Sequence, residues 1–355
     1  MSAMRIGLIG CGNIAGPYAQ DLKTYAEIEL VGVADMDAAR AATFAAEHGI
    51  RAYESVEALL NDPSVSLVVN LTSHFAHKDV TTRALNAGKH VYSEKPLALT
   101  YADAQELVKL ADRLGLRLGC SPFTLIGEAQ QTAWKLIRDG KLGTVRAVFA
   151  EVNWGRIESW HPAPGPFYEV GAMFDVGVYP LTILVAMFGP ARRVTSYGKV
   201  LYPQRVTKEG QPFEIKTPDF IVTMLELSDG TVVRLTTDFY VGHHTKQVGI
   251  EFHGDAASLY LESWFMPNSK IEVAEFGGSY SPMPLQGEPP EGVHWGLGIA
   301  DMVRMMAAGR PHRFTGEMAA HIVDILESSR RSMETERPVT LQSGFTPPEP
   351  VDWAN

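Results

Sequence analysis

The stretch "MRIGLIGCGNIAGPYAQDL", residues 4–22, decides the fold. It opens with a short apolar run typical of a buried strand, passes through "GCGNIA" at 10–15, and then becomes helical. Gly10 permits the tight turn, Gly12 lets the backbone approach a pyrophosphate, and the small Ala15 lets the helix pack on the sheet. This context predicts a dinucleotide-binding loop with phosphate on the helix N-terminus. The cofactor contacts expected from the loop are Gly10, Gly12, Asn13 and Ile14.

The next apolar run, "IELVGVAD", ends in a carboxylate at the position where such folds read the ribose. Asp35 follows Ala15 by about 20 residues, the spacing at which an acid accepts the ribose hydroxyls of NAD and repels the 2′-phosphate of NADP. An aspartate in an ordinary strand-end turn is the alternative. Arg40 keeps NADP possible as the cofactor.

Strand and helix patterns continue to alternate up to residue 121. Strands are expected at 28–35, 50–53, 65–72, 90–93 and 116–121, with helices between them, which predicts a doubly wound parallel sheet of six strands. In such sheets ligands bind beyond the carboxyl ends of the strands. The side chains expected there, facing the cofactor, are Asn70, Thr72, His74, His77, Glu94 and Lys95.

Composition excludes several classes of function. The chain has 355 residues with 45% hydrophobic and 20% charged residues, as expected for two globular domains. A formal net charge of −10 argues against a nucleic-acid partner. The two cysteines make no disulfide framework, and no apolar run is long enough for a membrane span, so we expect a cytoplasmic protein without a metal site.

After residue 121 the pattern changes to helices and hairpins. We expect a helix at 127–140, a strand at 144–156, and hairpins near 219–240 and 246–262. The expected fold class is therefore α/β: a Rossmann domain (1–121), then an α+β domain (122–342) with an open, mixed, mostly antiparallel sheet, and a tail (343–355). An open sheet face needs a cover, so a homodimer or homotetramer is expected. The stretch 281–292 is expected to form a surface loop.

The apolar stretch "GAMFDVGVYPLTILVAMFG", 171–189, carries two polar side chains. Asp175 and Tyr179 are spaced i, i+4, so one helix would place them on the same face. The alternative makes Asp175 a helix N-cap and Tyr179 a core aromatic. Upstream, Trp160, His161 and Tyr168 lie in an aromatic loop that either packs over a cleft or covers a domain seam.

Together these motifs resemble the Gfo/Idh/MocA oxidoreductases. The resemblance rests on the glycine fingerprint, on "NLTSHFAHKDVTTRALNAGKHVYSEKPLALT" (70–100) and on "DVGVYPLTIL" (175–184), and it runs from about Met4 to Leu341. The family's signature Asp-x-Gly-x-His appears here as Asp175-x-Gly177-x-Tyr179, which is similar to sugar-oxidising branches. Their Trp-Arg pair near the cofactor falls on Trp160-His161, so one charge is missing.

The resemblance implies how the chemistry would be divided. The lysine of Glu-Lys-Pro sits at the nicotinamide in that family, which maps onto Lys95. Lys95 would act as a base only with a pKa lowered by several units, whereas Tyr179 assisted by that ammonium is a second proton acceptor. The expected catalytic residues are Lys95, Tyr179 and Asp175, with Glu94 and Trp160 on the cofactor side. The expected substrate contacts are Lys95, His161, Tyr168, Asp175 and Tyr179.

Three functions are compatible with these motifs. The first is an NAD-dependent dehydrogenase that acts on a sugar, anhydrosugar or cyclic polyol. The second is an enzyme that uses NAD transiently for glycoside hydrolysis, elimination or epimerisation. The third is a non-catalytic dinucleotide-sensing regulator, against which the intact Lys95, Asp175 and Tyr179 argue.

Overall fold

The structure, a computed structural model, describes residues 3–242, 244–289 and 291–354. These residues form two compact units. The first comprises the chain up to Phe123 together with Val293–Val323, and the second comprises Thr124–Gly292 and the chain from Asp324 onward. The predicted 281–292 loop and 343–355 tail each include one residue, 290 and 355, that lies outside the described chain.

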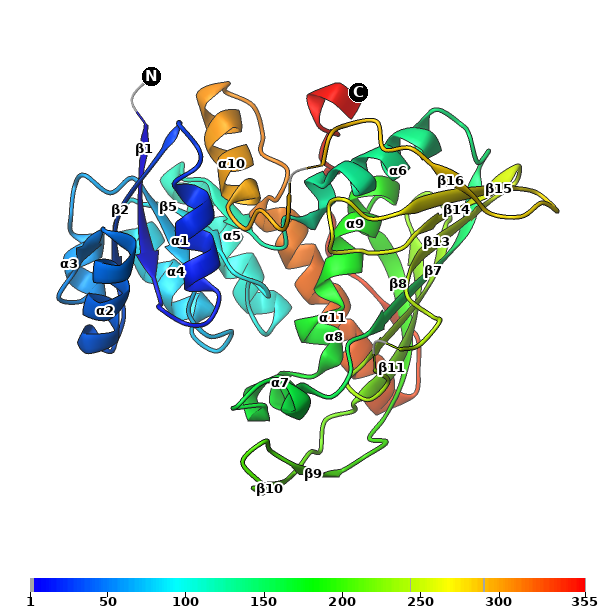
Figure 1. Cartoon of the computed structure of the whole chain (residues 1–355), viewed down its shortest axis with the longest axis horizontal. Helices are drawn as coiled ribbons and strands as arrows, with labels where there is room; N and C mark the ends of the chain where they lie inside the picture. The colour runs from blue at the N-terminus through cyan, green and yellow to red at the C-terminus, as the bar shows by residue number, and fades with distance from the viewer. Residues whose placement is uncertain (1–2, 243, 290, 355) are drawn as a thin grey trace. The chain divides into compact units, whose positions relative to one another are not determined.

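The first unit contains the predicted parallel sheet, which is confirmed. Its six strands run in the order β3-β2-β1-β4-β5-β6, all parallel, as in a doubly wound nucleotide-binding fold (Figure 1). The strands are β1 (Met4–Ile9), β2 (Ile28–Ala34), β3 (Arg51–Ala52), β4 (Leu67–Asn70), β5 (His90–Ser93) and β6 (Leu118–Cys120). The helices between them are α1 (Ala15–Leu22), α2 (Ala38–His48), α3 (Val56–Leu60), α4 (His77–Asn86) and α5 (Tyr101–Leu114). Strand order reverses between β1 and β4, and ligands bind at such a switch point.

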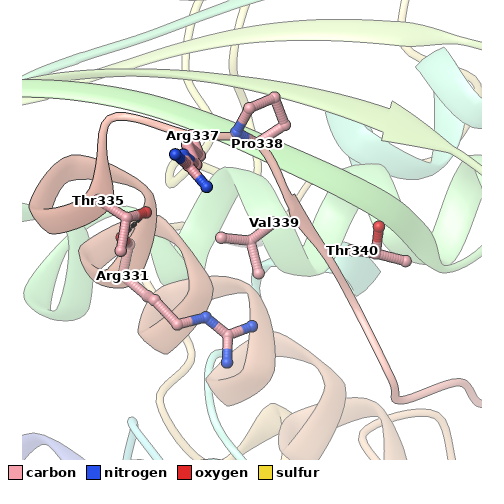
Figure 2. A pocket seen from close by; sticks show the side chains of 6 residues that line it. All are labelled: Arg331, Thr335, Arg337, Pro338, Val339 and Thr340. Atoms are coloured by element: carbon pink, nitrogen blue, oxygen red, sulfur yellow. Dashed lines mark hydrogen bonds between the residues drawn. The ribbon is translucent and has the colours of Figure 1, made fainter.

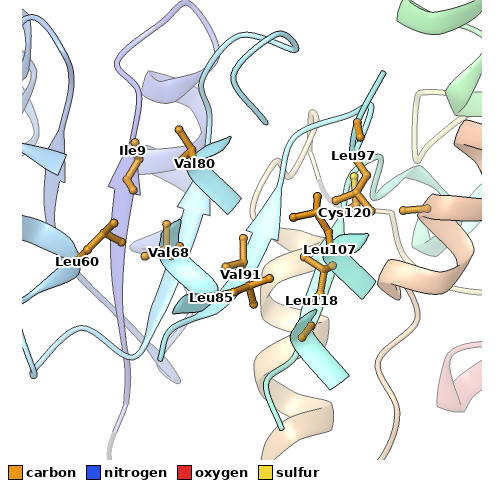
Figure 3. Close-up of a cluster of buried hydrophobic side chains, with 14 of the residues drawn as sticks. Ile9, Leu60, Val68, Val80, Leu85, Val91, Leu97, Leu107, Leu118 and Cys120 are labelled. Atoms are coloured by element: carbon orange, nitrogen blue, oxygen red, sulfur yellow. The ribbon is translucent and has the colours of Figure 1, made fainter. Parts of the chain in front are cut away.

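A continuous apolar core fixes the register of this sheet. Val68 and Val91 on neighbouring strands are fully buried, and Leu85 of α4 and Leu107 of α5 pack in the same cluster (Figure 3). Each such side chain contributes roughly 1.5–3 kcal/mol on leaving water. Because a slip of one residue would turn the buried row outward, the strand ends are fixed where the candidate site residues begin.

The domain boundaries differ from the expected 1–121 and 122–342, because the segment Val293–Val323 returns to the first unit. It carries α10 (Leu297–Ala307) and the start of α11 (Gly316–Thr335). Ala319, Ala320 and Val323 join the core of the first unit, and Trp295 packs on Tyr18 at 5.8 Å between ring centroids. A helix pattern alone does not reveal which core will bury its apolar face.

The second unit is built on one large mixed sheet, mostly antiparallel as predicted. Its order is β16-β15-β14-β13-β7-β12-β11-β8-β17, and only β7 and β12 pair in parallel. Both predicted hairpins are present, as β11–β12 and β13–β14. The strands are β7 (Val145–Asn153), β8 (Ala191–Lys199), β11 (Phe220–Leu227), β12 (Val232–Asp238), β13 (Gly249–Gly254), β14 (Ala257–Leu261), β15 (Ile271–Glu275), β16 (Ser281–Met283) and β17 (Val339–Thr340). Strand β16 occupies the start of the stretch expected to be a loop. A separate ribbon pairs β9 (Gln204–Val206) with β10 (Pro212–Glu214).

Helices cover one face of this sheet. Figure 1 shows α6 (Glu128–Arg138), α8 (Ala172–Asp175) and α9 (Val178–Phe188) on the same side of the strands. The tail after β17 also docks on the second unit: Asp324 accepts hydrogen bonds from the backbone of Gln342 and Ser343, and Gln131 of α6 accepts one from Val351.

Within the described residues, neither a membrane-spanning helix nor a metal-binding cluster is found. No helix among them combines the length and apolarity that crossing a membrane requires. No group of three or more histidine, cysteine or acidic side chains within that part of the chain is arranged to hold a metal ion.

Candidate active site

The glycine loop after β1 has the geometry of a phosphate cradle. Gly10 has φ +103°, and a side chain there would meet the carbonyl oxygen of Leu71 at 2.7 Å, so only glycine fits. A side chain at Gly12 would point into open space. Ile14, the residue before α1, supplies no capping side chain, and the first turn of α1 carries no acid. The loop therefore fits a dinucleotide pyrophosphate, since the helix is not capped by its own chain.

Asp35 is held rigidly at the end of β2. Its Oδ2 accepts a hydrogen bond from the Cys11 amide at 2.8 Å, and its Oδ1 accepts one from the Asp37 amide at 2.9 Å. A carboxylate has further lone pairs, so Asp35 can still accept hydrogen bonds from ribose hydroxyls. Arg40 lies 4.0 Å from Asp35 and 3.5 Å from Asp37. Burial, and then the charge of Asp35, raise the pKa of the Cys11 thiol to about 12, so it stays protonated at neutral pH.

The polar residues beyond β4 mainly bind one another. Asn70 is fully buried; its amide donates to the His77 carbonyl and to Thr81, and its carbonyl oxygen accepts from Thr72. The His77 ring lies 2.7 Å from the Pro96 oxygen and 3.0 Å from the Thr72 oxygen. Burial lowers the pKa of His77. These side chains link the end of β4 to the segment that follows β5.

His74 belongs to the same loop and is less buried. Its ring lies 4.2 Å from that of Phe75, which is 51% exposed. In this loop Ser73 and Phe75 are exposed, and Thr72 and His74 are partly exposed.

The buried side chain of Glu94 fixes the backbone of Lys95, the next residue in the chain. The Tyr18 hydroxyl donates to Glu94 Oε1 at 2.5 Å and lies 2.9 Å from the Ser121 hydroxyl, while the Lys95 amide donates to Glu94 Oε2 at 3.1 Å. Glu94 is 6% exposed, so its carboxylate is committed to α1 and to the backbone of its neighbour. Burial, followed by the charge of Glu94, raises the pKa of Tyr18.

In the second unit the stretch around Asp175 breaks into two helices. A single helix across both polar residues was expected, but α8 ends at Asp175, and α9 begins at Val178. At Gly177 a side chain would lie 2.5 Å from the Met173 oxygen, which requires glycine at the break. The interpretation of Asp175 as an N-cap is wrong, since it closes α8 instead.

Tyr179 lies in an aromatic cluster that the sequence did not predict. Its ring centroid is 5.1 Å from that of Trp264 and 5.6 Å from that of Phe265. Trp264 in turn packs on Trp154 at 5.8 Å. Aromatic neighbours at these distances restrain the ring plane of Tyr179.

The aromatic loop upstream divides into an exposed and a buried part. Trp160 is 44% exposed and packs edge-on against His161 and Phe167. Tyr168, by contrast, is 4% exposed; its hydroxyl donates to Glu158 at 2.5 Å and accepts from Arg205 at 2.6 Å. The Tyr168 hydroxyl is thus part of an internal hydrogen-bond network, and its role as a substrate contact stays a prediction.

Asp238, at the end of β12, is a buried acid with only one satisfied oxygen. Its Oδ1 accepts from the Tyr240 and Val241 amides at 2.8 and 2.6 Å, while Oδ2 is buried without a partner among the described residues. Burial raises the pKa of Asp238 to about 6, and the charges of Asp219 and Glu151 add to the effect.

Two hollows of the second unit contain none of the candidate residues. One, of about 590 Å³, lies where α11 ends and β17 begins; Figure 2 shows its six lining residues, with Arg331 and Arg337 among them. The other, of about 400 Å³, is lined mainly by apolar side chains of α8, β11 and α11, including Met173, Phe174 and Ile221. Neither contains Lys95, Asp175 or Tyr179.

Several residues of these networks were not predicted from sequence. Tyr18 and Glu94 are 76 positions apart, and Arg205 and Glu158 are 47 apart, so no local pattern connects them. The aromatic partner Trp264 follows a hairpin with no motif of its own. The one sequence signal for the contact between Tyr18 and Glu94 was a tyrosine on the inner face of α1. A tyrosine in that position has several structural explanations, so it did not indicate this partner.

Comparison with known proteins places both units. Residues 4–121 match the family model described as "Oxidoreductase family, NAD-binding Rossmann fold", and residues 130–260 match the "GFO/IDH/MocA C-terminal domain". The chain is 29% identical over 231 residues to the trans-1,2-dihydrobenzene-1,2-diol dehydrogenase of Bos taurus, which covers 64% of this chain and 66% of that enzyme. It is 29% identical over 263 residues to the 1,5-anhydro-D-fructose reductase of Ensifer adhaerens, covering 72% and 74%.

Solved structures support the fold. An NAD-binding oxidoreductase from Klebsiella pneumoniae superposes with a TM-score of 0.86 at 22% identity, covering 96% of this chain and 99% of that one. A levoglucosan dehydrogenase in complex with NADH and levoglucosan gives 0.85 at 17% identity, covering 96% and 100%. The matched region spans just under two thirds of the length of the dihydrodiol dehydrogenases.

Replacing Asp238 with a neutral residue should stabilise the protein at pH values above the folded-state pKa of Asp238. A folded-state pKa raised from 3.8 to about 6 means that stability is fully present below about pH 4 and is lost as pH rises through 6. The shift corresponds to at most about 3 kcal/mol, which solvent screening reduces to about 1–2 kcal/mol. Asp238→Asn should therefore lose less stability than wild type between about pH 5 and pH 8 in urea unfolding.

Asp255→Asn is the matched control, because Arg146 lowers the pKa of Asp255. Its neutralisation should lower stability at about pH 8, the opposite sign. Equal pH dependence in wild type and Asp238→Asn would contradict the assignment.

Proposed function

Because the chain belongs to the Gfo/Idh/MocA family of oxidoreductases, we propose that it is an NAD-dependent dehydrogenase. Its substrate is a sugar, anhydrosugar or cyclic polyol, and the reaction transfers hydride from a hydroxyl-bearing carbon. The sugar and diol enzymes among its relatives support this class of substrate.

The observation that carries the proposal is the exposure of three candidate side chains in otherwise buried segments. From Val91 to Ala98 every residue is buried except Lys95. From Gly171 to Ala186 every residue is buried except Asp175 and Tyr179. A group that exchanges a proton or a hydrogen bond with a substrate must be accessible, and in these two segments the accessible side chains are the three that the motifs single out.

The residues of the first unit fit NAD as cofactor. The pyrophosphate would lie on the Gly10–Gly12 loop and α1, and Asp35 would accept the ribose hydroxyls. When bound, the nicotinamide supplies the hydride acceptor. Thr72 and His74, at the carboxyl end of β4, would line the remainder of the site.

Each candidate has a distinct role in this proposal. Tyr179 takes the hydroxyl proton, with its ring fixed by Trp264 and Phe265. Lys95 supplies positive charge to the developing alkoxide. Asp175 orients a substrate hydroxyl. Glu94 and Tyr18 act through Lys95, because they hold its backbone.

A screen of aldoses, anhydrosugars and inositols for NADH formation tests the function. At least one class should reduce NAD, and the stereochemistry shared by the active compounds would identify the oxidised carbon. An enzyme that uses NAD transiently would convert its substrate without accumulating NADH. A regulator would bind NAD and convert none.

The cofactor preference follows from Asp35. A 2′-phosphate placed beside its fixed carboxylate meets like charge, so kcat/KM should favour NAD over NADP by about tenfold or more. Asp35→Ala should reduce that ratio, and Arg40→Ala should leave NAD use unchanged. A tenfold preference for NADP would refute the assignment and make Arg40 the phosphate ligand.

Removal of Lys95 or Tyr179 should impair turnover while NAD still binds. Lys95→Ala and Tyr179→Phe should each lower kcat by about 10²–10⁴-fold, the usual range for acid–base groups. The double variant should be little worse than either single one if the two act as a unit. Calorimetric NAD affinity should stay within about threefold of wild type, because the pyrophosphate and ribose contacts are assigned to Gly10, Gly12 and Asp35.

Lys109→Ala, at an exposed lysine that donates to Gln105 in α5, is the matched control. A Lys95→Ala enzyme with turnover close to that of Lys109→Ala would remove Lys95 from the mechanism.

The bare face of the large sheet supports self-association. Tyr197 of β8 and Met224 of β11 point away from the helices and are 61% and 41% exposed. We expect light scattering to give a multiple of the chain mass, 38.9 kDa. Met224→Glu should shift the equilibrium toward monomer, whereas Val206→Glu, an equal change on the separate β9–β10 ribbon, should not. A monomeric wild type at micromolar concentration would count against this interface.

A further inference from the structure

An exposed arginine of the second unit is held between two exposed tyrosines. The Arg156 guanidinium lies 4.8 Å from the ring centroids of both Tyr202 and Tyr240. The rings are 42% and 37% exposed, and their centroids are 6.3 Å apart. We call these three residues the arginine–tyrosine cluster. Trp160, which is 44% exposed, follows Arg156 after the single turn Ile157–Ser159.

The topology explains why these residues meet. Strands β7 and β12 are parallel neighbours, with Asn153 opposite Asp238 at their carboxyl ends. Arg156 lies on the loop that leaves β7, and Tyr240 lies on the loop that leaves β12. Loops that leave one edge of a sheet in the same direction form a common surface, as at ligand sites of parallel sheets.

Arg156 has no carboxylate partner within the described chain. Three acids of this unit have other partners: Glu158 and Asp219 bind Arg205, and one oxygen of Asp238 accepts from backbone amides. An unpaired guanidinium on a chain of net charge −10 is a local positive site on an acidic protein. Stacking on the two rings restrains the guanidinium plane and leaves its donors for a ligand.

Buried charges hold the cluster in place. Arg205, whose side chain is fully buried, donates to the Tyr202 carbonyl at 3.0 Å, and Asp219 accepts from the neighbouring Leu201 amide at 2.6 Å. Asp238 accepts from the Tyr240 amide. Burying such groups costs several kcal/mol per ion before pairing, so buried ion pairs often add little net stability compared with apolar residues. Their effect is to fix the backbones that present the two tyrosines, which is the rigidity that a binding site requires.

We propose that the arginine–tyrosine cluster binds the anionic group of a ring substrate, so that the enzyme acts on a sugar that carries a carboxylate or phosphate. The Arg156 fork binds the anion through two parallel hydrogen bonds, and the tyrosine rings contact the apolar face of the sugar. This assignment of substrate rests on the proposed dehydrogenase function, but the binding itself does not.

Calorimetry with three probes tests the site. Glucose, glucuronate and glucose 6-phosphate differ in the anionic group, so the last two distinguish carboxylate from phosphate. Wild type should bind one of the acids at least about tenfold more tightly than glucose, as expected for a charge-assisted bidentate pair. Arg156→Gln should reduce that affinity to the level of glucose, and Arg156→Lys should restore it only in part, because lysine lacks the fork.

Arg146→Gln is the matched control, since Arg146 is exposed on the same unit but already paired with Asp255. It should leave every affinity unchanged. Tyr202→Phe should keep the affinity for the acid because the ring remains, and Tyr202→Ala should weaken it. Unaltered thermal unfolding of Arg156→Gln will show that the fold is intact.

Equal affinity for acidic and neutral sugars, or an Arg156→Gln protein that binds the acid like wild type, would overturn the proposal. Failure of the two proposals can be told apart. Acid binding that depends on Arg156 without NADH formation from any sugar would leave the site standing and remove the dehydrogenase. NADH formation from neutral sugars that is unchanged in Arg156→Gln would leave the dehydrogenase function standing and remove the anion site.

Discussion

The buried carboxylate of Glu94 is the constraint on which the candidate chemistry of the first unit depends. It joins Tyr18 of α1, the helix that begins at the phosphate loop, to the backbone of Lys95. A hydrogen bond to an ionised acceptor is about twice as strong as a neutral one and loses more when broken inside a protein. The helix after the phosphate loop and the backbone of the lysine are thereby joined through one buried side chain. His77 adds a second link, from the end of β4 to Pro96 directly after Lys95.

The second unit applies the same principle with different residues. Arg205, Glu158 and Asp219 form an internal ion network beneath the loops that carry the exposed aromatic residues. Around Asp175 and Tyr179 an almost wholly apolar pair of helices leaves only those two side chains partly accessible. In both units rigid, buried surroundings support a few accessible polar groups. This arrangement positions the accessible polar groups accurately and restricts the motion of the segments that carry them.

Sequence alone predicted the parts of the fold that depend on local patterns. The glycine loop, the parallel sheet and both hairpins of the second sheet follow from turn chemistry and from runs of buried residues, each of which is encoded within a few neighbouring positions. The candidates Lys95, Asp175 and Tyr179 were found in the same way, from short motifs. The break at Gly177 was missed because a continuous apolar run gives no sign of a close backbone approach to Met173.

The remaining features are set by contacts between distant segments. The return of Val293–Val323 to the first unit depends on which core accepts Ala319 and Val323. The hydrogen bonds of Tyr18 to Glu94 and of Arg205 to Tyr168 give side chains that were predicted as ligand contacts a partner within the fold. Polar residues beyond strand ends are visible in a sequence, but whether their hydrogen bonds are directed to a ligand or to the fold is decided by partners that no spacing reveals.

Hydride transfer itself can be followed with one isotope. A sugar substrate labelled with deuterium at the oxidised carbon should deliver that deuterium to the nicotinamide, and one labelled NADH should be released for each sugar consumed. Deuterium that returns to the sugar, or is lost to water while the sugar is converted without release of NADH, would contradict the account and establish transient use of the cofactor.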